Sequence, residues 1–313
     1  MAQPSETFDT YDSIGEREDL SDVIYNISPT DTPFLSSAAK TQATAVLHEW
    51  QTDSLAAAVT NNAVIEGDEA TADAVTATTR LSNSSQILDK VVTITGTQEA
   101  VDKAGRASEI AYQIAKKAKE LKRDLESSLT SNNAEVTGGS STARQLGGLG
   151  SWVATNDVFG GSGASGGLGN TARTNGTQRA FTEAQLKSVI KSVWNAGGNP
   201  QIIMVGPFNK QKLSGFTGNS TRFDAGADAT LYTSVDVYAS DFGQTQVIPN
   251  RFSRDRDGWV LDMDYWGVAF LRDFSMHELA KTGDTEKRQL LVECTLESRN
   301  EAASGLIADL TTS

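Results

Sequence analysis

Side chains that commonly carry enzyme chemistry are scarce in this sequence. It contains two histidines, His48 and His277, and one cysteine, Cys294. A histidine-rich metal site or a Cys–His nucleophile pair would have to be assembled from distant positions. Cys294 also falls on the apolar side of an alternating pattern over 289–298, which predicts a buried strand and an unreactive thiol. We therefore expect no catalytic residue, no cofactor and no metal ligand.

Three short patterns match parts of known functional motifs, and each is incomplete. Residues 161–166 read GSGASG, the glycine spacing of a dinucleotide-binding loop, but no apolar helix follows them. We expect a flexible glycine loop there instead. The DFG at 241–243 has neither the catalytic loop nor the glycine-rich loop of a kinase. Asp262 and Asp264 are two positions apart, so on a strand both carboxylates would share one face, as in a hydrolase.

The composition indicates a folded, acidic protein. The 313 residues are 38% hydrophobic and 21% charged, with a net charge of −13. This balance argues against nucleic-acid binding through an overall basic field. No run of about 18 apolar residues predicts a membrane span, and the first residues lack the pattern of a secretory signal. A single cysteine excludes an internal disulfide framework. We expect a soluble protein made in the cytoplasm.

The elements that surround these residues begin with an acidic arm. Residues 1–31 carry eight acidic residues and one basic residue, Arg17. Leu20, Val23, Ile24 and Ile27 have the spacing of a short amphipathic helix. Prolines 29 and 33 then favour an extended or turning backbone ahead of an apolar tip. That tip, Phe34 and Leu35, has two interpretations: it docks on a neighbouring molecule, or it enters the core of its own subunit.

A long, weakly apolar stretch follows between two predicted strands. The strand candidates are TAVLHEW and SQILDKVVTITG, which are rich in β-branched residues. The stretch between them has too little bulky apolar content for a core of its own. A two-stranded loop that reaches away from the body fits this composition better than a structureless loop inside a domain.

The strongest helical pattern lies at 106–131. Six apolar residues form one stripe along it, namely Ile110, Ile114, Ala118, Leu121, Leu125 and Leu129. Lys116, Lys119 and Arg123 project from the opposite side. They form either a solvated face or a basic ridge that faces an anionic partner.

The remaining chain alternates loop, helix and strand. Residues 138–170 contain 11 glycines, which predicts a mobile loop. Thr182 and Gln185 form a capping box that opens a helix, whose predicted buried stripe includes Val193 and Trp194. A buried strand is expected at 200–206, and the last third of the chain is rich in strands.

This order of parts resembles the major capsid proteins of tailed bacteriophages, which have the Hong Kong 97-like α+β fold, and among them the SU10-type family. The similarity extends over the whole chain and rests on several segments in the right order. They are SPTDTPFLS (28–36), HEWQTDSL (48–55), EG (66–67), NSSQI (83–87), VTITGTQEAVDKAG (92–105), YQIAKKAKELKRDLES (112–127), FNKQKLSGFTG (208–218), DVYASDFGQTQVIPNRF (236–252) and LAKTGDTEKRQLLVECTLESRNEAASGLI (279–307).

The resemblance implies a division of the chain. It makes 1–43 an N-terminal arm and 44–95 an extended loop. It implies a peripheral domain from 96–181 and 263–313, which contains a spine helix at 106–131 and the glycine-rich loop 138–170. The axial domain would be 182–262.

The resemblance also implies function, partners and location. Many copies would form the pentamers and hexamers of an icosahedral head around double-stranded DNA, after assembly in the host cytoplasm. A separate scaffolding protein, a portal and a decoration protein are the other expected partners. The subunit interface is expected at Pro33, Phe34 and Leu35 and at Glu66, Asp68 and Glu69. The inner, DNA-facing surface is expected at Lys116, Lys119 and Arg123.

Two alternatives stay open at this point. The chain could be another virion component, such as a decoration or tail protein, or an α+β hydrolase that uses Asp262 and Asp264. Some relatives with this fold join subunits through an isopeptide bond that starts from a loop lysine. From Thr41 to Asp89 this chain has no lysine, so we expect a non-covalent shell.

Overall fold

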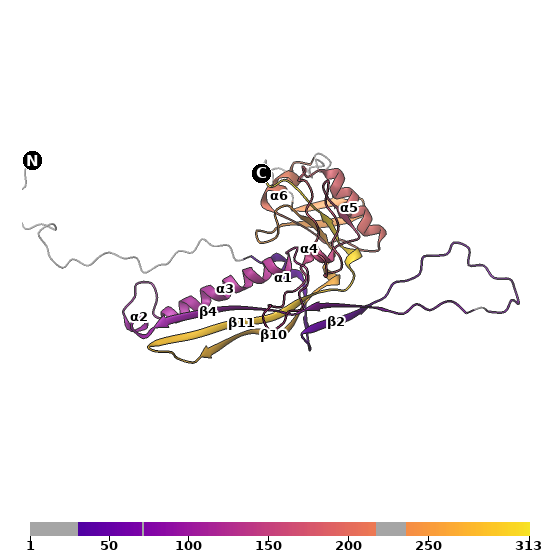
Figure 1. Ribbon diagram of the computed structural model, residues 1–313. Coiled ribbons are helices and arrows are strands. Elements are labelled where there is room, and N and C mark those ends of the chain that lie inside the picture. Colours follow the sequence, from indigo (N-terminus) through magenta and orange to yellow (C-terminus); the bar gives the residue numbers. More distant parts are fainter. Residues whose placement is uncertain (1–30, 71, 217–235) are drawn as a thin grey trace, which may run out of the picture.

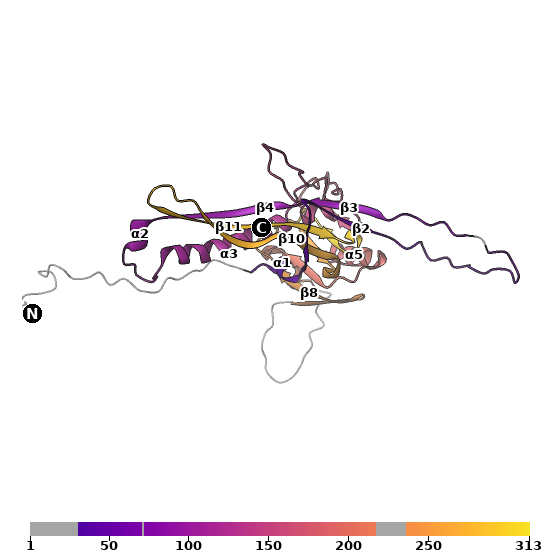
Figure 2. The same cartoon turned by 90° about the horizontal axis from the view of Figure 1, so that it is seen from below.

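The computed structural model describes residues 31–70, 72–216 and 236–313, and its outline is elongated (Figure 1). A compact unit sits on one side of a long helix-and-sheet body, and a narrow loop projects from one end of that body (Figures 1 and 2). The amphipathic pattern at 20–27 lies outside the described residues.

The long body is a four-stranded sheet, here called the spine sheet, with a helix along it. Its strand order is β1-β10-β11-β4. The strands are β1 (Ala39–Gln42), β4 (Gln86–Thr95), β10 (Trp266–Leu279) and β11 (Thr285–Ser298). β1 pairs in parallel with β10, and the other pairs are antiparallel. Helix α2 (Gly96–Ala100) follows β4, and its N-cap Thr95 accepts the Gln98 N–H.

The spine helix α3 (Glu109–Leu129) lies within the range predicted for it. Ser108 caps its N-terminus by accepting the Ala111 N–H. The end of its apolar stripe is fully buried against the spine sheet, at Leu121, Leu125 and Leu129. The beginning of the stripe is only half-buried, because α3 extends beyond the compact unit (Figure 1).

The compact unit is a six-stranded sheet in the order β5-β12-β9-β6-β8-β7. Its strands are β5 (Asp157–Val158), β6 (Ile202–Val205), β7 (Val237–Ser240), β8 (Gly243–Pro249), β9 (Gly258–Leu261) and β12 (Gly305–Ile307). Its helices are α5 (Glu183–Asn195), which has the predicted Thr182–Gln185 capping box, and α6 (Pro207–Ser214). In the DFG at 241–243, the first two residues form the turn between β7 and β8, and Gly243 begins β8. Three short helices elsewhere are α4 (Leu149–Trp152), η2 (Met263–Tyr265) and η3 (Glu301–Ala303).

Strand pairing cuts across three of the expected boundaries. β1 comes from the expected arm 1–43, and β4 comes from the expected extended loop 44–95, yet both are strands of the spine sheet. β5 and β12 lie outside 182–262, yet they pair in the sheet of the compact unit. Pairing partners so far apart in sequence leave no local signal that would mark these boundaries.

The position of Trp194 in α5 differs from the prediction. It was expected in the buried stripe beside Val193, but its side chain is 53% exposed. Its ring lies 5.2 Å from that of Phe242 at the surface of the compact unit. The helix buries one face only, and Trp194 falls just beyond its edge.

The glycine-rich segment 138–170 is packed, and the prediction of a mobile loop is wrong. Leu146, Leu149 and Trp152 within it are buried in the main core. Several of its glycines permit contacts that a side chain would block: a Cβ at Gly160 would lie 1.9 Å from the Thr177 carbonyl oxygen. Gly169, at φ +87°, lies against the Trp152 indole. The glycines thus serve close packing of the backbone.

Candidate assembly surfaces

The arm enters the body through a short helix, α1 (Pro33–Ser37). Proline at the first position has the φ angle that a helix needs and no N–H that would go unpaired, so Pro33 begins this helix. The prediction of an extended or turning backbone is therefore wrong from Pro33 onwards, and Pro29 lies outside the described residues. Phe34 is 1% exposed, and its ring lies edge-on to that of Trp266 with centroids 6.4 Å apart.

Phe34 and Leu35 belong to the core of their own subunit. Both are buried in the cluster that contains Leu121 and Leu125 of α3. The expectation that they dock on a neighbour is wrong, and the second interpretation of this apolar tip is correct. Pro33 beside them is half-buried. The physical reason is that α3 and the spine sheet leave an apolar site at their junction with the compact unit, which the arm fills.

A buried carboxylate holds α1 in this site. Glu126 of α3 accepts the Phe34 N–H on Oε1 and the Leu35 N–H on Oε2, both at 2.8 Å. Oε1 also accepts a hydrogen bond from the Asn250 side chain at 2.7 Å. Burial raises the pKa of the Glu126 carboxyl, against the effect of these three donors. One side chain therefore connects the arm, the spine helix and the compact unit.

The projecting loop is anchored at its base. β2 (Leu47–Thr52) and β3 (Thr79–Ser84) form an antiparallel pair. The Trp50 indole N–H donates to the Ser298 carbonyl at 2.7 Å, and its ring lies 5.4 Å from that of Trp152. His48 Nε2 lies 3.4 Å from Glu297 Oε2 on β11. This hydrogen bond, with others from Arg299 and Thr41, lowers the pKa of Glu297 to about 2.

Beyond this base, residues 53–78, here called the excursion, are described except for position 71 and project away from the body (Figure 2). The described part has no strand pairing, and all its residues are exposed. Its large apolar side chains are among the most exposed of the described chain: Leu55 (99%), Val59 (73%), Val64 (85%), Ile65 (78%) and Val75 (96%). Such exposure of apolar residues is typical of a surface that a partner covers.

The expected interface acids lie at a turn of the excursion. The Asp68 N–H donates to the Ile65 carbonyl at 3.1 Å, and Gly67 takes φ +83° inside that turn. Glu66, Asp68 and Glu69 are all exposed there. The three carboxylates are therefore accessible to another molecule.

The expected basic ridge divides into two parts. Lys116 and Lys119 are exposed on α3. Arg123 is half-buried, and its guanidinium lies over the Phe252 ring, 5.2 Å from the centroid. Arg123 therefore helps to pack α3 against the compact unit, and the accessible part of the ridge is Lys116 and Lys119.

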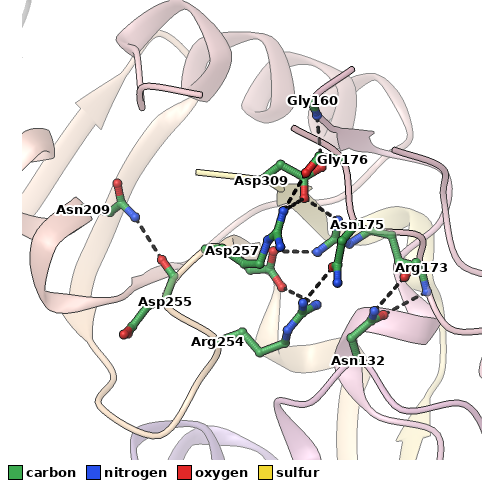
Figure 3. Close-up of polar contacts among 11 residues, drawn as sticks. Asn132, Gly160, Arg173, Asn175, Gly176, Asn209, Arg254, Asp255, Asp257 and Asp309 are labelled. Carbon is green, nitrogen blue, oxygen red and sulfur yellow. Dashed lines mark hydrogen bonds and ion pairs between the residues drawn. The ribbon is translucent and has the colours of Figure 1, made fainter. Parts of the chain in front are cut away.

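A buried ionic cluster, which was not predicted from the sequence, lies in the compact unit (Figure 3). The Arg173 side chain is 0% exposed and lies 2.7 Å from Asp257 and 3.3 Å from Asp309. Arg254 pairs with Asp257 at 3.0 Å, and Arg256 pairs with Asp309 at 2.6 Å. The cluster ties the chain after the glycine-rich segment to the loop before β9 and to the C-terminal residues. Removing one partner of such a buried pair commonly costs about 3–5 kcal/mol.

Two sequence signals could have indicated these buried groups. The run RDRD at 254–257 alternates charges directly before an apolar strand. Glu126 directly follows Leu125 on the buried stripe of the helix. Neither signal names its distant partners. Arg173 lies 84 positions from Asp257, Asp309 lies 53 positions from Arg256, and the partners of Glu126 lie 91 to 124 positions away.

The carboxylate pair proposed for a hydrolase has a structural role. Asp262 caps η2 by accepting the Asp264 N–H, and its other oxygen accepts the Asn199 N–H at 2.9 Å. Asp264 accepts a hydrogen bond from the Gln201 side chain at 3.0 Å. The two acids lie in a turn rather than on one strand face.

Burial raises the pKa of Cys294 to about 12, so its thiol is a core group.

Within residues 31–70, 72–216 and 236–313, no group of three or more His, Cys, Asp or Glu side chains could hold a metal ion. No helix in the same ranges is long and apolar enough to cross a membrane.

Comparison with known proteins gives a consistent picture. Residues 3–311 match the family described as SU10 major capsid protein. The chain is 30% identical, over 345 residues, to the major capsid protein of Escherichia phage Phieco32, covering 98% of this chain and 97% of that protein. A chain of the Cyanophage A-1(L) capsid asymmetric unit is structurally similar, with a TM-score of 0.66, 14% identity and coverage of 95% and 98%. A chain from the capsid of a native GTA particle has a TM-score of 0.64, 12% identity and coverage of 96% and 98%.

Proposed function

Because the chain belongs to the SU10 major capsid protein family, and is thus a tailed-phage major capsid protein with the Hong Kong 97-like α+β fold, we propose that it builds its shell through the excursion. The resemblance drawn from the sequence is confirmed. The observation that carries the proposal is the exposure of Leu55, Val64 and Val75 on a segment whose described residues are all exposed and have no strand pairing. A neighbouring subunit would cover these side chains in pentamers and hexamers.

The acids of the excursion add a polar component to this contact. Glu66, Asp68 and Glu69 would meet a basic or amide-rich patch of the adjacent subunit. Single contacts of this kind are weak, and the many copies of a shell would make them strong together. Pro33 begins a helix whose next two residues are buried in their own subunit, so the proposed contact rests on the excursion alone.

The other partners follow from the same proposal. Lys116 and Lys119 would contact packaged double-stranded DNA from the inner surface, without sequence preference. A separate scaffolding protein, a portal and a decoration protein would complete the head. Assembly would take place in the host cytoplasm, and the family's structural role assigns no catalytic step to the chain.

The register of the excursion's base suggests a direct test. Thr52 pairs with Thr79, so an Asn-Gly turn can close the hairpin when residues 53–78 are removed. We expect this variant to keep the far-UV circular dichroism and urea midpoint of the wild type. In negative-stain microscopy the wild type should form shells or capsomers, whereas the variant should form neither.

The opposite results would be informative. Normal shells from the variant would contradict the role of the excursion. Monodisperse monomers from the wild type, under conditions that include a scaffolding protein, would count against self-assembly. A variant that unfolds would be replaced by Leu55→Ser/Val75→Ser, which changes only exposed side chains.

A further inference from the structure

Three lysines form one ridge along α3. Lys116, Lys119 and Lys122 are three positions apart, which places them in a single row on a helix surface. Lys122 lies over the Phe274 ring, 5.9 Å from its centroid. Lys116 and Lys119 are exposed and have no salt-bridge partner in the part of the chain that the structure describes, whereas Lys117 between them pairs with Glu120.

The arm joins the body next to this row. The N–H groups of Phe34 and Leu35 on Glu126 fix the point where the arm meets α3. Lys122 and Lys119 precede Glu126 by four and seven positions, so they lie on the same side of the helix. At 1.5 Å per residue, the three lysines lie about 6, 10 and 15 Å along the helix axis from the attachment point.

A groove of mixed lining lies beside the same row. It has a volume of about 480 Å³ and is lined by Phe270, Leu271 and Phe274 of β10 together with Asp273 and with Lys40, Thr41 and Gln42 of β1. Met276 next to it is 54% exposed. The surface therefore combines unpaired positive charge with exposed apolar side chains.

The segment that enters here has the complementary composition. Residues 1–31 carry eight acids against Arg17 alone. Four of the acids, Glu16, Glu18, Asp19 and Asp22, accompany the apolar residues Leu20, Val23, Ile24 and Ile27. The ten residues from Asp22 to Asp31 can span up to about 33 Å, more than twice the distance to Lys116.

We propose that, in the unassembled subunit, residues 16–27 lie on the spine helix of their own chain. Their carboxylates pair with Lys116 and Lys119, and their apolar side chains cover Phe274 and Met276. The short tether favours the chain's own arm over that of a second copy, because it raises the effective concentration to the millimolar range. DNA would compete with the arm for the same lysines.

A zero-length carbodiimide cross-linker tests this arrangement in the isolated full chain. It joins carboxylates to lysine amines only when the two groups touch. An equal mixture of ¹⁵N-labelled and unlabelled subunits distinguishes the chain's own arm from a neighbour's. We expect cross-links from the acids at 16–22 to Lys116 or Lys119 within single chains. Cross-links only between labelled and unlabelled chains, or none to these lysines, would overturn the proposal.

Trypsin gives a second measurement, because Arg17 is the one basic residue before Lys40. In Lys116→Glu/Lys119→Glu, cleavage after Arg17 should be about tenfold faster at low salt, the size expected for the loss of a few surface ion pairs. Lys191→Glu changes an exposed lysine of α5 and should cleave at the wild-type rate. Equal rates for all three proteins would contradict the proposal. Because neither measurement needs a shell, failure here leaves the proposed assembly role untouched.

Discussion

Glu126 and Asn250 lie 124 positions apart, and the Asn250 amide donates a hydrogen bond to the Glu126 carboxylate at 2.7 Å. Two backbone N–H groups of the arm share that carboxylate. One buried side chain thus binds the arm, the spine helix and the compact unit together. Assembly contacts made by the arm would act on the rest of the subunit through this side chain.

Glu126→Ala should destabilise the subunit by about 3 kcal/mol or more. The substitution leaves the N–H groups of Phe34 and Leu35 and the Asn250 amide without their acceptor, at about 1–3 kcal/mol for each unsatisfied buried donor. Urea unfolding would measure the loss. Glu120→Ala, which removes a half-buried carboxylate paired with Lys117 on the same helix, is the matched control, and equal midpoints for the two variants would contradict the role of Glu126.

Gly160→Ala should lower the free energy of unfolding by about 2 kcal/mol. Its Cβ would lie 1.9 Å from the Thr177 carbonyl oxygen and 3.2 Å from Asp309 Cβ, so the backbone must shift. A Cβ at the neighbouring Gly161 meets nothing within 4 Å. Gly161→Ala should therefore stay within about 0.5 kcal/mol of the wild type in the same urea experiment. A glycine-rich segment that is only a mobile loop would tolerate both changes equally.

The base of the excursion should make stability depend on acid. The pKa of Glu297 is lowered from 4.5 to about 2. A lowered pKa means that the stabilisation is present above the unfolded value and is lost as the pH falls from about 4.5 towards 2. The loss is at most about 3 kcal/mol for this one group. Urea titrations across this range should show a smaller decrease for Glu297→Gln than for the wild type, and parallel decreases would refute the assignment.

Removing residues 2–31 should leave a folded subunit, since α1 and its contacts to Glu126 stay in place. A deletion that extends to residue 36 should unfold or strongly destabilise the subunit, because it removes Phe34 and Leu35 from the core. Circular dichroism and thermal unfolding would compare the two deletions. Equal melting temperatures would mean that α1 contributes little to the fold.

Mature particles should separate into monomers in detergent. An isopeptide bond from the excursion needs a lysine amine, and from Thr41 to Asp89 there is none. Lys40 and Lys90 lie on β1 and β4 of the spine sheet, and Lys90 pairs with Asp124 at 2.6 Å. Boiled particles should give one band near 33.3 kDa on a denaturing gel. A ladder of multimers that resists reducing agents would overturn this prediction.

The sequence by itself determined the local elements and the family. Some features depend only on spacing and composition within one segment, and these can be predicted from the sequence. They are the stripe of Leu121, Leu125 and Leu129, the Thr182–Gln185 capping box, and the long, weakly apolar stretch before β3. Because nine ordered segments matched one family, the fold could be assigned without any side-chain geometry.

Only the tertiary structure decided which elements share a sheet and which side chains are buried. Phe34 and Leu35 read as an exposed tip because their partner Glu126 is about 90 positions away, and the glycines of 138–170 read as flexible because the atoms they approach belong to distant segments. β4 and β12 joined sheets outside their expected domains for the same reason. Burial is a property of contacts between segments far apart in sequence, and a local pattern constrains those contacts without specifying them.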